Sequence, residues 1–356
     1  MRRRPGSVHD AWVTNLGPVT NLGSIGDLPL HHGGTLRDAK LAYVTYGRLA
    51  PDGRNAVLLT HGYTSSHLFA DPAVAAPGGW SALVGPGRAI DTDRYFVVSS
   101  NMLGSSYGST APRSVDPASG RAWGPDFPRI ALEDIVAAQR RLLDGLGVRE
   151  LAAVIGPSYG GFQAFTWGVE FPDFVRALVP VTTGLSVGVA IDVAALRRRL
   201  AADPSWNGGH HYATDGMVGA MTAYREATLR RYGIDAVLAA QHPELDAAAR
   251  AAAVQPIARD WARVFDPHSV LVLGAAANDY DATPKLARLR ARVLFVLSTT
   301  DTLFPPALAE PVTSALRAAG VDAAYHELAS AHGHLAPGVD AAKWAPVLAQ
   351  FLAELG

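Results

Sequence analysis

The sequence predicts an α/β fold, in which a mostly parallel sheet lies between two layers of helices. Short apolar runs, of the kind that form strands covered on both faces, alternate with longer segments of helical periodicity. The alternation breaks once, between about residues 184 and 284, where the pattern is helical throughout. Strand–helix alternation brings parallel strands together and places the connecting helices on both faces. We therefore predict a core built from 28–183 and 285–356, with a helical lid inserted at 184–284.

Composition narrows the class of protein. Of the 356 residues, 49% are hydrophobic and 18% are charged, which suits a large folded core, and the net charge of −1 argues against a nucleic acid or an anionic membrane as partner. The chain has no cysteine, so disulfides, thiolate metal sites and cysteine nucleophiles are excluded. The basic start is followed by polar residues, and no apolar run would span a bilayer. We expect a cytoplasmic protein.

The first half of the chain is predicted to contain an N-terminal arm, four strands and one helix. Residues 1–27, rich in Gly, Asn and Pro and without periodicity, are expected to form the irregular arm. The strands are predicted at 28–36, 40–46, Ala56–Thr60 and Tyr95–Ser99. Ile130–Leu146 carries its apolar residues on one helical face and ends between glycines. The intervening segment 101–127 is a long loop, and loops of this length are usually functional.

The second half continues the alternation around the predicted lid. The strands are expected at Leu151–Ile155, Ala177–Val181, Val293–Ser298 and Ala323–Leu328. A helix carrying Phe162, Phe165 and Trp167 follows the first of these strands, and Ala307–Ala319 and Ala341–Leu355 are the last two helices. Within the lid, helices are predicted at 194–200, 217–232, 236–240 and 245–263.

The stretch Gly156-Pro157-Ser158-Tyr159-Gly160 stands between a buried strand and a helix. A serine on such a tight turn has its hydroxyl raised above the sheet edge, and the crowded backbone admits only small residues on either side. The alternative is a glycine-rich turn of a nucleotide-binding sheet. The glycines do not fit Gly-x-Gly-x-x-Gly, however, and no Gly-Lys-Ser/Thr follows. We interpret Ser158 as a nucleophile.

A serine nucleophile needs a base and a carboxylate that orients the base. Asp301 follows the strand Val293–Ser298, and His334 follows the strand Ala323–Leu328, so both lie at strand ends in the chain order Ser, Asp, His. His334 is preferred because Gly333 permits a close approach to the serine, while His332 remains an alternative base. Asp301 could instead cap the helix that follows.

Acyl transfer also needs donors for the oxyanion that develops on the substrate. We expect these donors to be the backbone N–H groups of Tyr159, which follows the nucleophile, and of Tyr63, which follows the strand Ala56–Thr60. His61-Gly62 could equally be an ordinary turn at the end of that strand. The histidines show no spacing typical of a zinc site, so no metal is assigned.

Over most of its length the chain resembles the homoserine O-acetyltransferases, a family within the α/β-hydrolase superfamily. The resemblance is carried by eight segments: Gly85–Phe96, Asn101–Gly104, Gly108–Thr110, Asp126–Pro128, Tyr159–Ala164, Asp203–Gly209, Asp301 with Leu303–Pro306, and Ser330 with Gly333–His334. It implies an α/β-hydrolase fold with a helical lid. It also implies that the nucleophile, acid and base are Ser158, Asp301 and His334, in agreement with the chain order.

The chain departs from this family where the family binds homoserine. The resemblance implies an aspartate for the substrate ammonium directly after the catalytic histidine, where this chain has Leu335. It also implies a lid arginine for the substrate carboxylate, but the corresponding helix has no arginine until Arg225, whose register the sequence does not determine. Tyr159 stands where the family usually has methionine. An enzyme without both charged groups should bind a zwitterion poorly.

These observations favour a serine hydrolase that cleaves a small, fairly apolar carboxylic ester through an acyl-Ser158 intermediate. The alternative is an O-acetyltransferase that uses acetyl-CoA as co-substrate and homoserine or another hydroxyl compound as acceptor. A non-catalytic binding protein on the same fold is a third hypothesis. In each case the partner is a small molecule and no bound cofactor is expected. By analogy with the family, the chain could form a homodimer.

Overall fold

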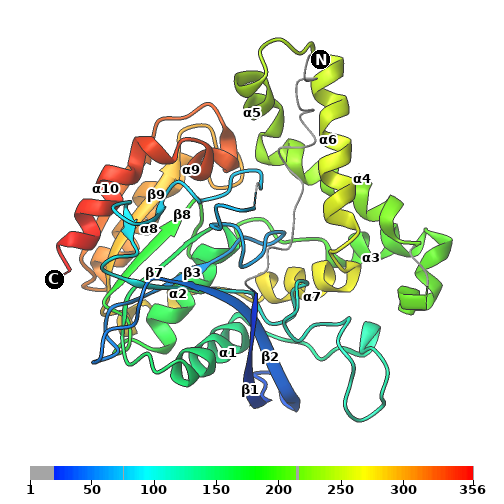
Figure 1. Ribbon diagram of the computed structural model, residues 1–356, viewed down its shortest axis with the longest axis horizontal. Helices are drawn as coiled ribbons and strands as arrows, with labels where there is room; N and C mark the ends of the chain where they lie inside the picture. Colours follow the sequence, from blue (N-terminus) through cyan, green and yellow to red (C-terminus); the bar gives the residue numbers. More distant parts are fainter. Residues whose placement is uncertain (1–19, 75, 214–215, 356) are drawn as a thin grey trace, which may run out of the picture.

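The computed structural model describes residues 20–74, 76–213 and 216–355, and within them it contains an eight-stranded sheet (Figure 1). In spatial order the strands are β1 (Asn21–Pro29), β2 (Thr35–Tyr46), β6 (Phe96–Ser100), β3 (Ala56–Thr60), β7 (Leu151–Pro157), β8 (Ala177–Val181), β9 (Arg292–Ser298) and β10 (Ala323–Leu328). From β6 to β10 all neighbours are parallel, whereas β2 runs antiparallel to both β1 and β6. The predicted α/β fold with a mostly parallel sheet is confirmed.

Alternate residues of the central strands pack into two separate cores. Leu58 packs with α1 (Leu132–Gly145), α2 (Tyr159–Glu170) and α8 (Ala309–Ala318) on one face of the sheet. Val57 and Leu59 pack on the other face, with α10 (Ala341–Ala353) and the short strands β4 (Val84–Gly85) and β5 (Ile90–Asp91). All five residues of β3 are buried because both faces of the strand are covered.

The N-terminal strands differ from the prediction. Residues 21–27 belong to β1 rather than to an irregular arm, and the strand expected at 28–36 is in fact the end of β1, a turn and the start of β2. The pairing of β1 with β2 shifts register on both sides of Gly26. Such irregularities interrupt the two-residue alternation from which a strand is predicted. The first nineteen residues of the expected arm lie outside the described part of the chain.

Between β8 and β9 the described residues form five α-helices on one side of the sheet (Figure 1). These are α3 (Val193–Ala201), α4 (Val218–Tyr232), α5 (Ile234–Gln241), α6 (Ala247–Ala262) and α7 (Pro267–Asn278). The two ends of the segment lie together, since the N–H of Ala282 donates to the carbonyl of Leu185 at 2.8 Å. A single segment inserted into the core would have its two ends close together in this way. We therefore keep the term lid for residues 184–284.

The helix α7 has no counterpart in the prediction. Nine of its twelve residues are buried, so it lacks the polar face that marks an amphipathic helix in a sequence. Its start does carry a local signal, because the Asp266 side chain accepts a hydrogen bond from the N–H of His268 and Pro267 occupies the first turn.

The remaining elements are short. The 3₁₀-helices are η2 (Gly124–Asp126), η3 (Pro204–Gly209), η4 (His211–Ala213), η5 (Thr283–Arg288), η6 (Pro306–Leu308) and η7 (Gly333–Leu335), and α9 spans Ala336–Val339. In the described part of the chain, no helix combines the length and the apolar character needed to cross a bilayer.

Substitution Leu58→Ala tests the packing of the core. The side chain is fully buried, so its truncation should lower the free energy of unfolding by about 2–5 kcal/mol through lost burial and a residual cavity. Leu22→Ala, at a side chain that is 61% exposed, is the matched control and should change the value by about 0.5 kcal/mol or less. Urea unfolding measures both. Equal effects of the two substitutions would contradict the assignment of Leu58 to the core.

Candidate active site

Ser158 lies at the junction of β7 and α2, in a backbone conformation that few residues adopt. Its φ of 56° and ψ of −119° are strained for a residue with a side chain. The turn is closed against β3, because a Cβ atom added to Gly156 would lie 2.1 Å from Oγ1 of Thr60, and one added to Gly160 would lie 2.3 Å from the Thr60 carbonyl oxygen. Glycine is therefore required at both positions.

His334 and Asp301 are in direct contact. The Nδ1 atom of His334 lies 2.7 Å from Oδ2 of Asp301, and both side chains are almost fully buried. This contact leaves Nε2 of His334 as the nitrogen that can accept a proton. The other carboxylate oxygen, Oδ1, accepts hydrogen bonds from the N–H groups of Leu303 at 2.8 Å and Phe304 at 3.3 Å. Asp301 thus stabilises the following turn and also holds the imidazole.

His332, the alternative base, is engaged elsewhere. Its Nδ1 atom lies 2.8 Å from Oδ2 of Asp340, and the residue is absent from the described lining of the cavity that contains Ser158 and His334. The geometry therefore favours His334 as the base.

Ser158 and His334 line one cavity of about 120 Å³ beneath the lid. Its apolar lining includes Leu68, Phe69, Val74, Trp80, Ile257 and Leu335. Polar groups are contributed by Thr64, Tyr107, Arg225 and Tyr232. The described residues of the lining include no Asp or Glu. The volume suits a small substrate. Among the described lining residues, Arg225 is the only one with a permanent charge, and that charge is positive.

Arg225 provides that charge from the lid helix α4. Its side chain is buried, its guanidinium donates to Oγ1 of Thr64, and it lies 5.1 Å from the ring centroid of Trp261. Burial lowers the pKa of Arg225 from its ordinary value, but arginine remains charged at neutral pH. Its Nε is buried without a partner, and no carboxylate of the described residues forms an ion pair with it. The structure thus shows that Arg225 lies on the face of α4 that lines the cavity, which the sequence alone did not determine.

Leu335 forms part of the cavity wall and also contacts the lid. It is buried in an apolar cluster with residues of α4, α5 and α6, including Leu229, Ile234 and Val254. This position, directly after His334, therefore joins the loop that follows β10 to the lid. The side chain offers no group that could bind an ammonium ion.

The two expected oxyanion donors belong to residues whose rings stack on each other. The rings of Tyr63 and Tyr159 are 5.8 Å apart and nearly parallel. Their hydroxyls donate to consecutive turns of α7, Tyr63 to the carbonyl of Val270 and Tyr159 to that of Leu273 at 3.2 Å. Within the described residues, neither backbone N–H donates to an acceptor, which leaves both available. Their role as oxyanion donors stays a prediction.

His61 holds the loop that carries Tyr63, a role that the sequence did not indicate. The side chain is fully buried, and its Nε2 accepts a hydrogen bond from the N–H of Met102 at 3.2 Å. Its carbonyl accepts from Nε2 of Gln163 at 3.1 Å, and the Gln163 amide oxygen accepts from Gln139 at 2.7 Å. These bonds connect the loop after β3 to α2 and α1. In the described ranges, no three His, Cys, Asp or Glu side chains converge as a metal site would require.

The chain is similar to known O-acyltransferases and to an esterase. A family model described as alpha/beta hydrolase fold matches residues 55–337. Homoserine O-acetyltransferase of Geobacter sulfurreducens is 36% identical over 92% of this chain and 95% of its own length. Serine O-succinyltransferase of Xanthomonas campestris pv. campestris has the same identity and the same shares of the two chains.

Solved structures show the same fold. Esterase E22 superimposes with a TM-score of 0.82 at 26% identity, covering 94% of this chain and 99% of that one. Homoserine O-acetyltransferase from Bacillus anthracis superimposes with a TM-score of 0.81 at 22% identity, covering 94% and 97%.

The burial of His61 predicts a loss of stability in acid. Burial lowers the pKa of His61 from 6.5 to about 4 in the folded protein, so between these values the unfolded chain binds more protons. The free energy of unfolding should therefore fall as the pH drops from about 6.5 to about 4, by up to about 1.4 kcal/mol for each pH unit from this group. His67, with a pKa lowered to about 3, acts in the same direction.

Urea unfolding between pH 4.5 and 7 measures this slope. His61→Gln removes one titrating group and should reduce the slope, although it also lowers stability at pH 7. An identical pH dependence in the two proteins would show that His61 is not the group responsible.

Proposed function

The chain belongs to the homoserine O-acetyltransferase family of α/β hydrolases, and from this premise we propose that it is a serine-dependent O-acyltransferase. In this proposal an acyl group passes from a thioester such as acetyl-CoA to Ser158, and then to the hydroxyl of a small acceptor that carries a carboxylate. No bound cofactor takes part, and the acyl thioester is a co-substrate.

The arrangement of His334 and Asp301 supports the first half of the reaction. His334 removes the proton of the Ser158 hydroxyl as Oγ attacks the acyl carbonyl carbon, and Asp301 holds the imidazole in the required tautomer. The N–H groups of Tyr63 and Tyr159 donate to the oxyanion. The C–S bond then breaks, and the departing thiolate takes the proton from His334. The acyl group remains esterified to Ser158.

The second half reverses these roles with a different hydroxyl compound. His334 removes the proton of the acceptor hydroxyl, whose oxygen attacks the acyl carbonyl. The bond to Ser158 breaks, and the proton returns to the serine oxygen through His334. The product is an ester of the acceptor, and the enzyme regains its original state.

The observation that carries the proposal is the position of Arg225 in the same cavity as Ser158 and His334. A buried guanidinium without a carboxylate partner is costly unless a ligand supplies the anion. Its fork of donors matches a carboxylate in geometry. An acceptor with a carboxylate, as the names of the two 36% identical relatives indicate for those proteins, satisfies this requirement.

Leu335 favours a second candidate, the carboxylic-ester hydrolase that the sequence analysis preferred. Without an acidic group beside His334, the site has no partner for the ammonium group of an amino-acid acceptor. Water can then hydrolyse the acyl-enzyme instead. The likeness to esterase E22 is consistent with this outcome. The two candidates share the acyl-Ser158 intermediate and differ only in the compound that accepts the acyl group.

Incubation with acetyl-CoA, with and without homoserine or serine, distinguishes these candidates. Release of CoA that rises with the hydroxy amino acid and yields its O-acetyl ester would support the transferase. Release that is independent of both acceptors would support the hydrolase. Ser158→Ala should lower the release of CoA, and the hydrolysis of p-nitrophenyl acetate, by roughly a thousandfold or more in either case. Unchanged turnover in Ser158→Ala would contradict the acyl-Ser158 mechanism.

Substitution Arg225→Met tests the carboxylate site. It should raise the KM for the carboxylate-bearing acceptor by roughly tenfold to a hundredfold, because a hydrogen bond to a charged group contributes about 1.5–3 kcal/mol. Transfer of the acyl group to water should change far less, since water has no carboxylate. Arg230→Met, at an arginine exposed on the same helix, is the matched control and should leave the KM unchanged. An equal KM in all three proteins would show that Arg225 does not bind the acceptor.

A further inference from the structure

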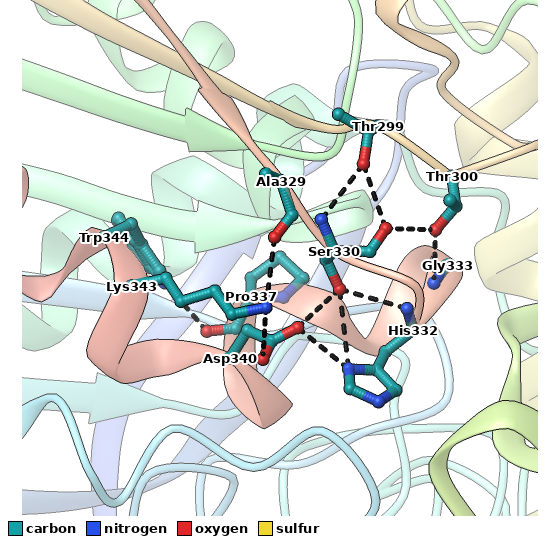
Figure 2. A network of polar contacts seen from close by, with 10 residues as sticks. All are labelled: Thr299, Thr300, Ala329, Ser330, His332, Gly333, Pro337, Asp340, Lys343 and Trp344. Atoms are coloured by element: carbon teal, nitrogen blue, oxygen red, sulfur yellow. Dashed lines mark hydrogen bonds and ion pairs between the residues drawn. The ribbon is translucent and has the colours of Figure 1, made fainter. Parts of the chain in front are cut away.

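A second cluster of carboxylate, imidazole and hydroxyl groups lies beside the catalytic loop (Figure 2). The Oδ2 atom of Asp340 lies 2.8 Å from Nδ1 of His332 and accepts a hydrogen bond from Oγ of Ser330 at 2.5 Å. The other carboxylate oxygen lies 3.0 Å from Nζ of Lys343. None of these four residues belongs to the described lining of the cavity around Ser158. The reaction proposed above does not use them.

The cluster is hydrogen-bonded to the loop that carries His334. Oγ of Ser330 also accepts from the backbone N–H of His332 at 3.0 Å, and the carbonyl of Ala329 accepts from Nζ of Lys343 at 3.1 Å. The backbone on the N-terminal side of His334 is thus bonded to Asp340 and Lys343 at the start of α10. That helix is anchored in the core by Trp344, which is fully buried.

On its other side, the same loop is bonded to the loop that carries Asp301. The carbonyl of Ser330 accepts hydrogen bonds from the hydroxyls of Thr299 and Thr300, both at 2.9 Å. The hydroxyl of Thr300 in turn accepts from the N–H of Gly333 at 3.0 Å, directly before His334 (Figure 2). The loops that carry the acid and the base are therefore fixed to each other and, through Asp340, to α10.

The carboxyl group of Asp340 is in the charge state that these hydrogen bonds require. Burial raises the pKa of its carboxyl group, but the bonds from Ser330, His332 and Lys343 lower it, and the net effect keeps the pKa below its ordinary value. The carboxylate is therefore ionised at neutral pH and can accept all three donors. An amide at this position would have only one acceptor oxygen for them.

We propose that Asp340 is a positioning residue for His334, acting through His332 and Ser330. The carboxylate holds the loop after β10 so that the imidazole of His334 stays within 2.7 Å of Asp301 and at the cavity that it shares with Ser158. A displacement of about 1 Å in a catalytic group can cost a hundredfold in rate. This inference rests on the proposed function, because the acyl-transfer reaction is its readout.

Substitution Asp340→Asn keeps the size of the side chain and removes its charge. It should lower kcat by roughly tenfold or more while the KM stays within about twofold, because Asp340 itself does not line the substrate cavity. Labelling of Ser158 by a fluorophosphonate probe should slow by the same factor, since it also requires His334. Glu244→Gln is the matched control, because Glu244 is an exposed lid carboxylate that lies 3.2 Å from another histidine, His242. It should leave kcat and the labelling rate unchanged.

A purely structural role for Asp340 would give a different result. The melting temperature of Asp340→Asn would fall, while kcat and the labelling rate, measured well below that temperature, would stay within twofold of the unaltered protein. That outcome would overturn the inference. If Asp340→Asn does not fold, Ser330→Ala provides the same test, because it removes one bond to Asp340 and keeps the pair with Lys343. It should lower kcat severalfold with an unchanged KM, and an unchanged kcat would overturn the inference.

The failure of this inference can be told from the failure of the proposed function. If Ser158→Ala abolishes turnover and Asp340→Asn leaves kcat unchanged, only the positioning role is wrong. If Ser158→Ala leaves turnover unchanged, the proposed function itself is wrong.

Discussion

The turn between β7 and α2 is the constraint on which the rest of the site depends. Ser158 is held at a positive φ because the strand must reverse into a helix while its backbone lies against Thr60 of β3. Such strain persists only where the surrounding structure determines the conformation. Here the parallel pairing of β7 with β3 and β8 and the packing of α2 on the sheet hold the turn in place. A site built on this turn is as rigid as the core beneath it.

The lid completes the site with groups of two different kinds. Arg225 brings a buried positive charge to the cavity, and the helix α7 accepts hydrogen bonds from the hydroxyls of Tyr63 and Tyr159, the two residues proposed to supply the oxyanion donors. Leu335 packs against lid helices from the core side. The lid is therefore joined to the loop that follows the catalytic histidine and to the loop that follows β3. A shift of the lid would alter substrate binding and the proposed oxyanion donors together.

Two histidines on one short loop each pair with a carboxylate from another segment, and their surroundings give the two pairs different roles. His334 lines the cavity with the buried Asp301 behind it, whereas Asp340 and His332 are bonded to a hydroxyl and a lysine at the start of α10. A carboxylate partner alone therefore does not make a histidine a catalytic base. What separates the two pairs is access to the substrate, since His334 lines the cavity with Ser158.

The sequence alone determined the parallel part of the sheet, because β3, β8 and β10 are continuous apolar or alternating runs whose bounds follow from local pattern. It also predicted Ser158, Asp301 and His334 as the catalytic residues, because each lies at a strand end in a required order. Only the tertiary structure decided the rest. The bulged strand β1 and the buried helix α7 lack a periodic pattern, since their form depends on distant partners. Arg225 could be assigned to the cavity, and His332 to Asp340, only once helices and loops far apart in the chain were packed together, because contacts of this kind leave no trace in local periodicity.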